Sequence, residues 1–220
     1  PGGQPLGELS SNETAVVVGK THQISHFRLG ASFKFAFSNL AGYRASAILA
    51  DLGGTFIHPT QDFRVALVIR NAGVMLAKYT DTATSSLPFD VQLGTTFKPE
   101  HMPFRFSITA YHLTREVTYY DPAGGEEEPG ALDKLFRRFT FGAELLLHRN
   151  VNILLGYNYR LHQELKLENG GGAAGITFGF SARIKRVEFI FGRNTFVVGQ
   201  AGYAFTLTTA IDKMWKRKAN

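Results

Sequence analysis

Residues 87–113 read LPFDVQLGTTFKPEHMPFRFSITAYHL and contain two runs of alternating apolar and polar side chains, joined by a short turn. In the second run, apolar residues occupy every other position, at Phe104, Phe106, Ile108 and Ala110. Successive side chains of a β-strand point to opposite faces, so this spacing predicts a hairpin in a sheet with one apolar and one polar face. The nature of the protein then depends on what covers the apolar face.

The same spacing recurs along the rest of the chain. In residues 27–38, Phe33, Phe35 and Phe37 alternate with small or polar residues, a period that is too regular for a helix. Besides the two arms of the hairpin, nine further strands are predicted, at residues 13–21, 27–38, 45–57, 63–70, 139–148, 151–160, 176–185, 187–191 and 203–211. The expected fold is therefore an all-β, antiparallel, up-and-down sheet of about eleven strands, with one or two helical turns at residues 132–138 and loops at 74–86 and 161–172.

The composition fits a sheet with half of its positions in oil and half in water. Hydrophobic residues make up 44% of the 220 residues, with 19 Phe and 23 Gly, while the mean hydropathy is only −0.07. No run of about 18 apolar residues is present, so no transmembrane helix is expected. The net charge is +6, but the basic residues are spread over many strands, and their only cluster lies in the tail at residues 212–220. We therefore expect no nucleic-acid partner and interpret the tail as disordered.

The connections between the predicted strands alternate in length. Short turns are expected near residues 22, 58, 100, 149 and 185, and longer connections near 40, 80, 125, 170 and 199. Outer-membrane β-barrels have this asymmetry, with short periplasmic turns and long surface loops. A soluble sandwich or lipocalin-like barrel is the alternative, but repeated Arg, Lys, Glu and Asp on the polar face favour a membrane barrel with a polar interior.

An outer-membrane barrel of a single bacterial chain normally has an even number of strands. The loop lengths place the end of the eleventh strand on the periplasmic side and the start of the first strand at the surface, so we expect an odd number of strands upstream. The opening segment PGGQPLGE is likewise interpreted as following a missing front end. Residues 1–211 are interpreted as part of such a transmembrane barrel domain, truncated at its N-terminus, and residues 212–220 as a basic C-terminal tail.

The polar side chains give little sign of catalysis. Cysteine is absent, the histidines lack the spacing of zinc ligands, and no glycine run is followed by a P-loop lysine. His162, Glu164 and Glu168 are a weak candidate for a cation site and are interpreted as a solvated loop. We expect no catalytic residue, no metal and no cofactor, so the protein is not expected to be an enzyme.

Two sets of residues are candidates for function. Charged residues expected to face the interior of the barrel either pair across it or line a path for anionic solutes; they are Arg28, Lys34, Asp51, Arg64, Arg70, Asp90, Arg105, Glu144, Arg160, Arg183 and Lys185. A long loop on a rigid scaffold often carries function, and the candidate docking residues in the longest loop are Tyr119, Tyr120, Glu126, Glu127 and Glu128.

Three segments carry a resemblance to a known family: RNAGVMLAKYTDTATSSLPFDVQLGTTFKPEHMPFRFSITAYHL, LFRRFTFGAELLLHRNVNILLGYNYRLHQELKL and AGITFGFSARIKRVEF. With them, residues 10–211 resemble the carboxy-terminal two-thirds of the PorQ family, outer-membrane proteins of the type IX secretion system of Bacteroidetes. The most specific parts of this resemblance are the short motifs LPFD and MPFRFS and the hairpin from GAELLL to GYNYR.

The resemblance implies a barrel of the FadL and PorV type in the outer membrane of a Gram-negative bacterium. It implies a non-enzymatic anchor that holds a PorZ-like surface protein beside PorU-like and PorV-like components, where exported cargo is joined to anionic lipopolysaccharide. The partners are then this surface protein together with outer-membrane lipid and lipopolysaccharide. A FadL-like transport barrel or porin for hydrophobic or anionic solutes is the alternative.

Overall fold

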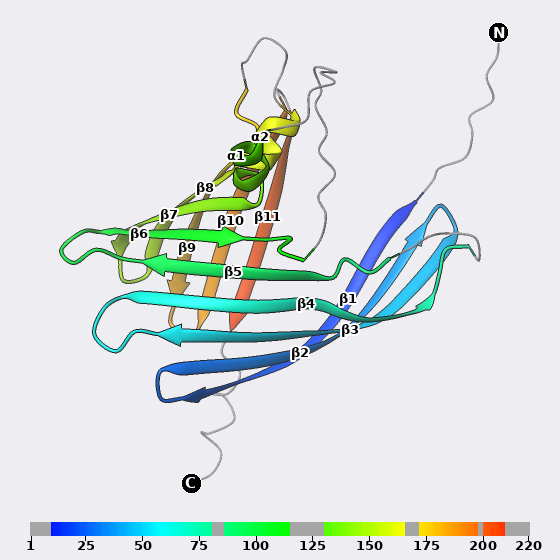
Figure 1. The fold of residues 1–220 in the computed structure, drawn as a ribbon, viewed down its shortest axis with the longest axis horizontal. Coiled ribbons are helices and arrows are strands. Elements are labelled where there is room, and N and C mark those ends of the chain that lie inside the picture. Colours follow the sequence, from blue (N-terminus) through cyan, green and yellow to red (C-terminus); the bar gives the residue numbers. More distant parts are fainter. Residues whose placement is uncertain (1–9, 81–85, 115–129, 166–171, 198–199, 210–220) are drawn as a thin grey trace. The chain divides into compact units, whose positions relative to one another are not determined.

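The computed structural model describes residues 10–80, 86–114, 130–165, 172–197 and 200–209 (Figure 1). These residues form a single eleven-stranded sheet whose strand order follows the sequence from first to last. The strands are β1 (Ser11–Ile24), β2 (Phe27–Leu40), β3 (Tyr43–Ile57), β4 (Phe63–Ala77), β5 (Asp90–Phe97), β6 (Phe104–Ala110), β7 (Phe139–His148), β8 (Val151–Asn158), β9 (Ile176–Ile184), β10 (Val187–Val197) and β11 (Gln200–Thr209). Two short helices, α1 (Ala131–Phe136) and α2 (Tyr159–Leu165), interrupt them.

The predicted all-β, antiparallel, up-and-down sheet of eleven strands is confirmed, and so is the helical turn near residue 132. The sheet is not closed, because β1 and β11 stand at the two ends of the strand order. Within the described residues, none of the helices combines the length and the apolar character needed to cross a membrane.

Several predicted strand ends and connections differ from the structure. β4 runs on to Ala77, although a loop was expected from residue 74. β8 ends at Asn158, and the chain enters α2 where strand and then loop were expected. The connection after β2 has only residues 41 and 42, both with positive φ (51° and 89°), so it is a tight turn and not one of the longer connections. The connection between β10 and β11 likewise spans only residues 198–199.

The chain divides into two compact units. Unit 1 contains residues 1–57 and 66–93, which include β1 to β3 and most of β4. Unit 2 contains residues 58–65 and 94–220, which include β6 to β11 and both helices. Each unit has its own set of polar contacts.

In unit 1, the strand register places like side chains on the same face. Phe33 of β2 pairs with Val18 of β1 and with Ala50 of β3. The side chains of this apolar face are exposed, and Phe33 keeps 46% of its surface accessible. On the opposite face Ala45, Ala47 and Leu49 of β3 are buried beside the charged residues of β2 and β3. The packed interior of unit 1 therefore lies on the polar face, and the phenylalanines lie outside it.

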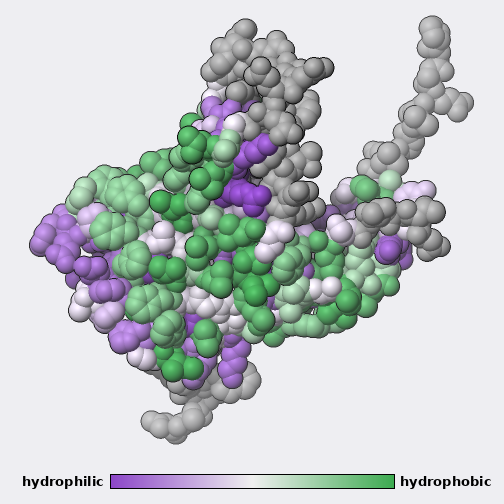
Figure 2. All heavy atoms as spheres, viewed as in Figure 1, coloured by the Kyte–Doolittle hydropathy of each residue, from purple (hydrophilic) through white to green (hydrophobic). Residues whose placement is uncertain are grey.

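Unit 2 repeats this arrangement. Phe178 of β9 pairs with Leu155 of β8 and lies on the apolar face, with 47% of its surface exposed. Ser181 pairs with Asn152 on the polar face, and Ser181 is only 6% exposed. Figure 2 shows apolar residues spread over much of the face that is turned to the viewer. In both units the apolar face is the more open one, which is the reverse of a soluble sheet with an apolar core.

Candidate functional site

In unit 1, one carboxylate on the polar face accepts hydrogen bonds from three neighbouring groups. Asp51 of β3 accepts hydrogen bonds from the hydroxyl of Ser32 at 3.2 Å and from the backbone N–H of Asn71 at 2.8 Å. Its Oδ1 also lies 2.7 Å from Nζ of Lys34, which in turn donates to Oδ1 of Asn71 at 2.5 Å. Asn71 has a left-handed backbone (φ 57°) at the position in β4 where its amide donates to the carboxylate. The cluster joins β2, β3 and β4 and leaves its charges compensated.

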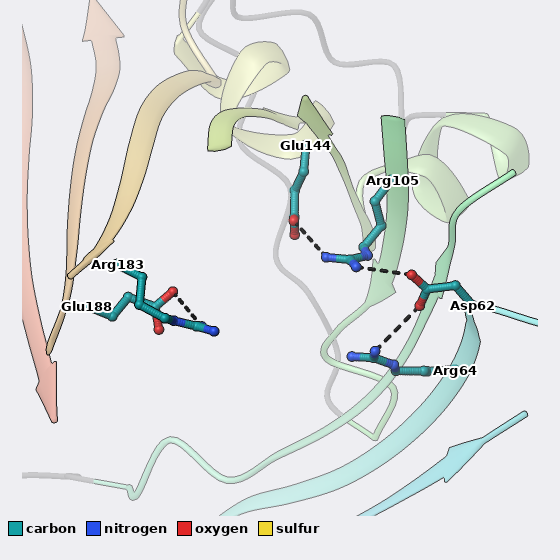
Figure 3. A network of polar contacts seen from close by, with 6 residues as sticks. All are labelled: Asp62, Arg64, Arg105, Glu144, Arg183 and Glu188. Carbon is teal, nitrogen blue, oxygen red and sulfur yellow. Dashed lines mark hydrogen bonds and ion pairs between the residues drawn. The ribbon is translucent and has the colours of Figure 1, made fainter. Parts of the chain in front are cut away.

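In unit 2, four charged side chains form an alternating chain across the polar face (Figure 3). Arg105 and Glu144 are direct partners in the register of β6 and β7, and Nη1 of Arg105 lies 3.0 Å from Oε2 of Glu144. Nη2 of the same guanidinium lies 3.1 Å from Asp62, and Asp62 lies 3.4 Å from Arg64. The side chains of Arg105, Asp62 and Glu144 are about a quarter to a third exposed, so each pair contributes on the order of 0.2–1 kcal/mol.

A further pair lies on the same face of the hairpin β9–β10. Arg183 and Glu188 are register partners, and Nη2 of Arg183 lies 3.0 Å from Oε1 of Glu188. The two residues lie on either side of the two-residue turn at residues 185–186, which fixes their pairing. Figure 3 shows this pair apart from the chain of four.

A polar cavity of about 590 Å³ lies between these two sets of contacts in unit 2. Its lining residues include three arginines, one glutamate and two smaller polar residues: Arg105, Arg149, Arg183, Glu188, Asn152 and Ser181. Three cations and one anion line it, and a volume of this size suits a small ligand. The excess of cations over anions in this lining is able to attract a small anion.

The two helices form a second cluster in unit 2, at the ends of β7 and β8 (Figure 1). Asp133 of α1 accepts from Nε of Arg137 at 2.6 Å and from the hydroxyl of Tyr159 of α2 at 2.7 Å. Oδ1 of Asn158 accepts from the backbone N–H of Leu161, which caps the first turn of α2, and lies 3.3 Å from the Tyr111 hydroxyl. These contacts join α1 to α2 and hold both helices against the ends of β6 and β8.

Both tyrosines of this cluster favour their neutral form. The hydrogen bond to Asp133, helped by burial, raises the pKa of Tyr159 above its ordinary value. Burial raises the pKa of Tyr111. The Tyr159 hydroxyl donates to Asp133 and the Tyr111 hydroxyl to Asn158, so the cluster acts as a structural clamp on α1 and α2.

Nine of the eleven charged residues predicted to face the interior fall into three groups. Lys34, Asp51, Arg64, Arg105, Glu144 and Arg183 take part in the ion pairs of the polar face described above. Asp90 is buried and accepts from Gln92 at 2.6 Å, and Arg28 donates to Gln23 at 3.1 Å. Arg70 is exposed beside the left-handed residue Asn71.

Two residues of that set do not lie on strands, so their assignment is corrected. Arg160 belongs to α2, where its Nε lies 2.7 Å from Glu164, because β8 has already ended at Asn158. Lys185 lies in the turn between β9 and β10 with a left-handed backbone (φ 55°) and is exposed. The docking candidates Tyr119, Tyr120, Glu126, Glu127 and Glu128, together with the basic tail, lie outside the described residues.

The prediction overlooked the acidic partners Asp62 and Glu188. Glu188 was detectable, because a two-residue turn at residues 185–186 pairs position 188 with position 183. Asp62 was not detectable in the same way, since its contact with Arg105 spans 43 residues of sequence. Among the described residues, no group of three or more His, Asp or Glu side chains is arranged to hold a metal ion.

No protein-family model matches the chain, and no curated protein matches it either.

Proposed function

We propose that the chain is part of a membrane-spanning β-barrel of a bacterial outer membrane, with lipid on its apolar face and a polar interior. The observation that carries this proposal is the exposure of the apolar face on strand after strand in both units. Phe33, Phe104 and Phe178 are all at least one-third exposed, whereas the ion pairs of Lys34 and Arg105 occupy the opposite face. Soluble monomers rarely expose apolar patches larger than a few hundred Å².

Within that membrane, the proposed role is a non-enzymatic anchor of the type IX secretion system. The chain would hold a PorZ-like surface protein through its long loops, beside PorU-like and PorV-like components that attach cargo to anionic lipopolysaccharide. The support for this finer role is the resemblance of the three quoted segments, together with the clamp of α1 and α2, which fixes the ends of β6 to β8 where long connections begin.

Lipid contact is tested with single tryptophans. In a Trp215→Phe background, Phe178→Trp and Thr177→Trp place one indole on the apolar face and one on the polar face of β9. In bilayers with brominated acyl chains, Phe178→Trp is expected to lose most of its fluorescence and Thr177→Trp little. Equal quenching of the two variants, or extraction of the chain from membranes without detergent, overturns the membrane proposal.

The anchor role is tested with a purified PorZ-like surface protein. Replacement of Glu126, Glu127 and Glu128 by Ser is expected to weaken its binding to the detergent-solubilised chain, while Glu100→Ser in a short turn leaves binding unchanged. Binding that is equal in both variants, or no binding by the unmodified chain, contradicts the anchor role and leaves the lipid-facing sheet standing.

A transport barrel for hydrophobic or anionic solutes is the second candidate. The observation in its favour is the polar cavity lined by Arg105, Arg149 and Arg183. Planar-bilayer recording of the chain separates the two roles. Steady anion-selective conductance that falls in Arg149→Glu favours transport, and a silent bilayer favours the anchor.

A further inference from the structure

The tip of the hairpin β9–β10 in unit 2 carries a second hollow, on the face opposite the ion pairs. Its volume is about 690 Å³, and almost all of its lining surface is apolar. The residues around it are Ala182, Ile184, Lys185, Arg186, Val187 and Phe189. Four of these residues are apolar and two are cationic, so the groove has an apolar surface and a positively charged end.

The strand register explains the apolar floor. Ile184 pairs with Val187, and Ala182 pairs with Phe189, so the four side chains belong to the apolar face of neighbouring strands. On the far side, Leu207 of β11 pairs with Phe189 and extends the same face. Because the side chain of Ala182 is small, it leaves space for the hollow. Ile184, which also lines the hollow, keeps 73% of its surface exposed. No described side chain fills the groove.

The turn explains the cationic end. β9 stops at Ile184 and β10 starts at Val187, so Lys185 and Arg186 alone make the turn, and both are exposed. The one carboxylate within this hairpin, Glu188, lies on the polar face, where it pairs with Arg183. Both positive charges therefore stand at the end of the apolar groove, with the acid of their own hairpin turned to the other side.

We propose that this groove binds an anionic phospholipid, with one acyl chain along Ile184 and Phe189 and the phosphate against Lys185 and Arg186. The proposal rests on the proposed lipid contact of the apolar face and adds to it a defined site with a preference for headgroup charge. A groove of about 690 Å³ lies within the usual range for ligand clefts. Basic residues at a membrane surface attract anionic lipids, whereas a phosphatidylcholine headgroup carries no net charge.

The experiment uses the folded chain in a neutral detergent and measures bound lipid by native mass spectrometry. Equal amounts of phosphatidylglycerol and phosphatidylcholine with the same acyl chains are added, and the ratio of the two bound species is recorded. The charge variant is Lys185→Asn with Arg186→Gln, because Asn tolerates the left-handed backbone at position 185. Lys185→Arg, which keeps the charge, and Lys98→Gln in the turn after β5 are the matched controls.

The unmodified chain is expected to prefer phosphatidylglycerol. Each cation near an anionic headgroup favours binding about fivefold, so the double charge variant is expected to reduce the preference about 25-fold. Both controls are expected to keep it. Ala182→Trp, which fills the groove, is expected to reduce retention of both lipids, while Ala143→Trp elsewhere on the apolar face leaves retention unchanged.

The outcomes separate this site from the proposed function. If Phe178→Trp is quenched by brominated lipid but all variants bind the two lipids in the same ratio, the site is wrong and the membrane barrel stands. Equal loss of preference in Lys98→Gln and in the double charge variant also overturns it, because the selectivity then comes from general charge. Binding of a second copy of the chain in place of lipid, released by Ala182→Trp, overturns it as well. If Phe178→Trp is not quenched, both proposals fall.

Discussion

The polar faces of the two units accommodate their charged side chains in different ways. In unit 1, Ala45, Ala47 and Leu49 pack beside a single cluster around Asp51, whose partner Lys34 is 12% exposed. In unit 2, the polar face carries a chain of ion pairs and a cavity of about 590 Å³. The charges of unit 1 lie beside small buried side chains, whereas those of unit 2 border the larger cavity.

This difference predicts which substitutions each unit tolerates. A packed interior responds to added volume and to the loss of one buried partner, because neither space nor water is present to compensate. A charged, partly hydrated interior responds weakly to single losses, because water and neighbouring charges replace the missing partner. This contrast leads to four testable expectations of decreasing magnitude.

The largest effect is expected for Gly73→Ala in β4 of unit 1. A β-carbon at this position would overlap the carbonyl oxygen of Ile48 and lie 2.8 Å from Cα of Leu49, so neighbouring backbone has to move. The free energy of unfolding is expected to fall by about 3 kcal/mol or more. The matched control is Gly192→Ala in β10 of unit 2, where nothing lies within 4 Å, and its change is expected to stay within about 0.5 kcal/mol. Chemical unfolding in detergent gives both values, and equal losses would show that the backbone of β3 beside Gly73 adjusts at no more cost than the open site at Gly192.

The next effect concerns the ion pair of unit 1. Lys34→Met leaves the Asp51 carboxylate, which is 22% exposed, without its cation. Loss of one partner of a buried pair costs about 3–5 kcal/mol, and partial exposure reduces the expected cost to about 2 kcal/mol. Arg183→Met in unit 2 removes a cation that is 57% exposed, and its expected cost is under about 1 kcal/mol. A larger loss in Arg183→Met than in Lys34→Met would mean that the packed and hydrated interiors are assigned the wrong way round.

A smaller effect, with a characteristic salt dependence, is expected for Arg105→Gln in unit 2. This change removes a guanidinium that reaches both Asp62 and Glu144. The expected loss is about 1 kcal/mol at low salt and less at high salt, because partly exposed charges are screened within about 10 Å at 0.1 M. The loss in Lys34→Met is expected to change less over the same salt series. A salt-independent loss in Arg105→Gln would indicate that this network is as dry as the cluster of unit 1.

The strands of both units were predictable from the sequence for one physical reason. A sheet with one apolar face and one polar face imposes a strict period of two, and residues 27–38 show it without interruption inside β2 (Phe27–Leu40). The charged residues of the polar face followed from the same period. Their pairing across adjacent strands, such as Arg105 with Glu144, follows from the register once the hairpins are known.

The wrongly predicted strand end and turn depend on local sequence signals that the alternation of apolar and polar residues obscures. Tyr157, Tyr159 and Leu161 continue the period of two across the start of α2, although Asn158 is a good helix N-cap and Arg160 and Glu164 have helical spacing. The turn at residues 41–42 was expected to be longer, yet Gly42 with φ 89° is a typical signal for a two-residue hairpin turn. The contact of Asp62 with Arg105 depends on the stagger of distant strands, which no local pattern specifies.

The smallest effect is expected at the helical clamp of unit 2 and appears only at high pH. Hydrogen bonding to Asp133 raises the pKa of Tyr159 above its ordinary value of about 10. The stability that this bond gives is therefore fully present below about pH 10 and is lost as the pH rises through the folded-state pKa. In hydrogen exchange, the amides of α1 and α2 are expected to lose protection in this alkaline range, whereas the amides of β2 and β3 in unit 1 keep theirs. Tyr159→Phe is expected to show weaker protection at neutral pH and little further loss on alkalinisation. A variant that loses protection with pH as steeply as the unmodified chain would show that another group holds the two helices together.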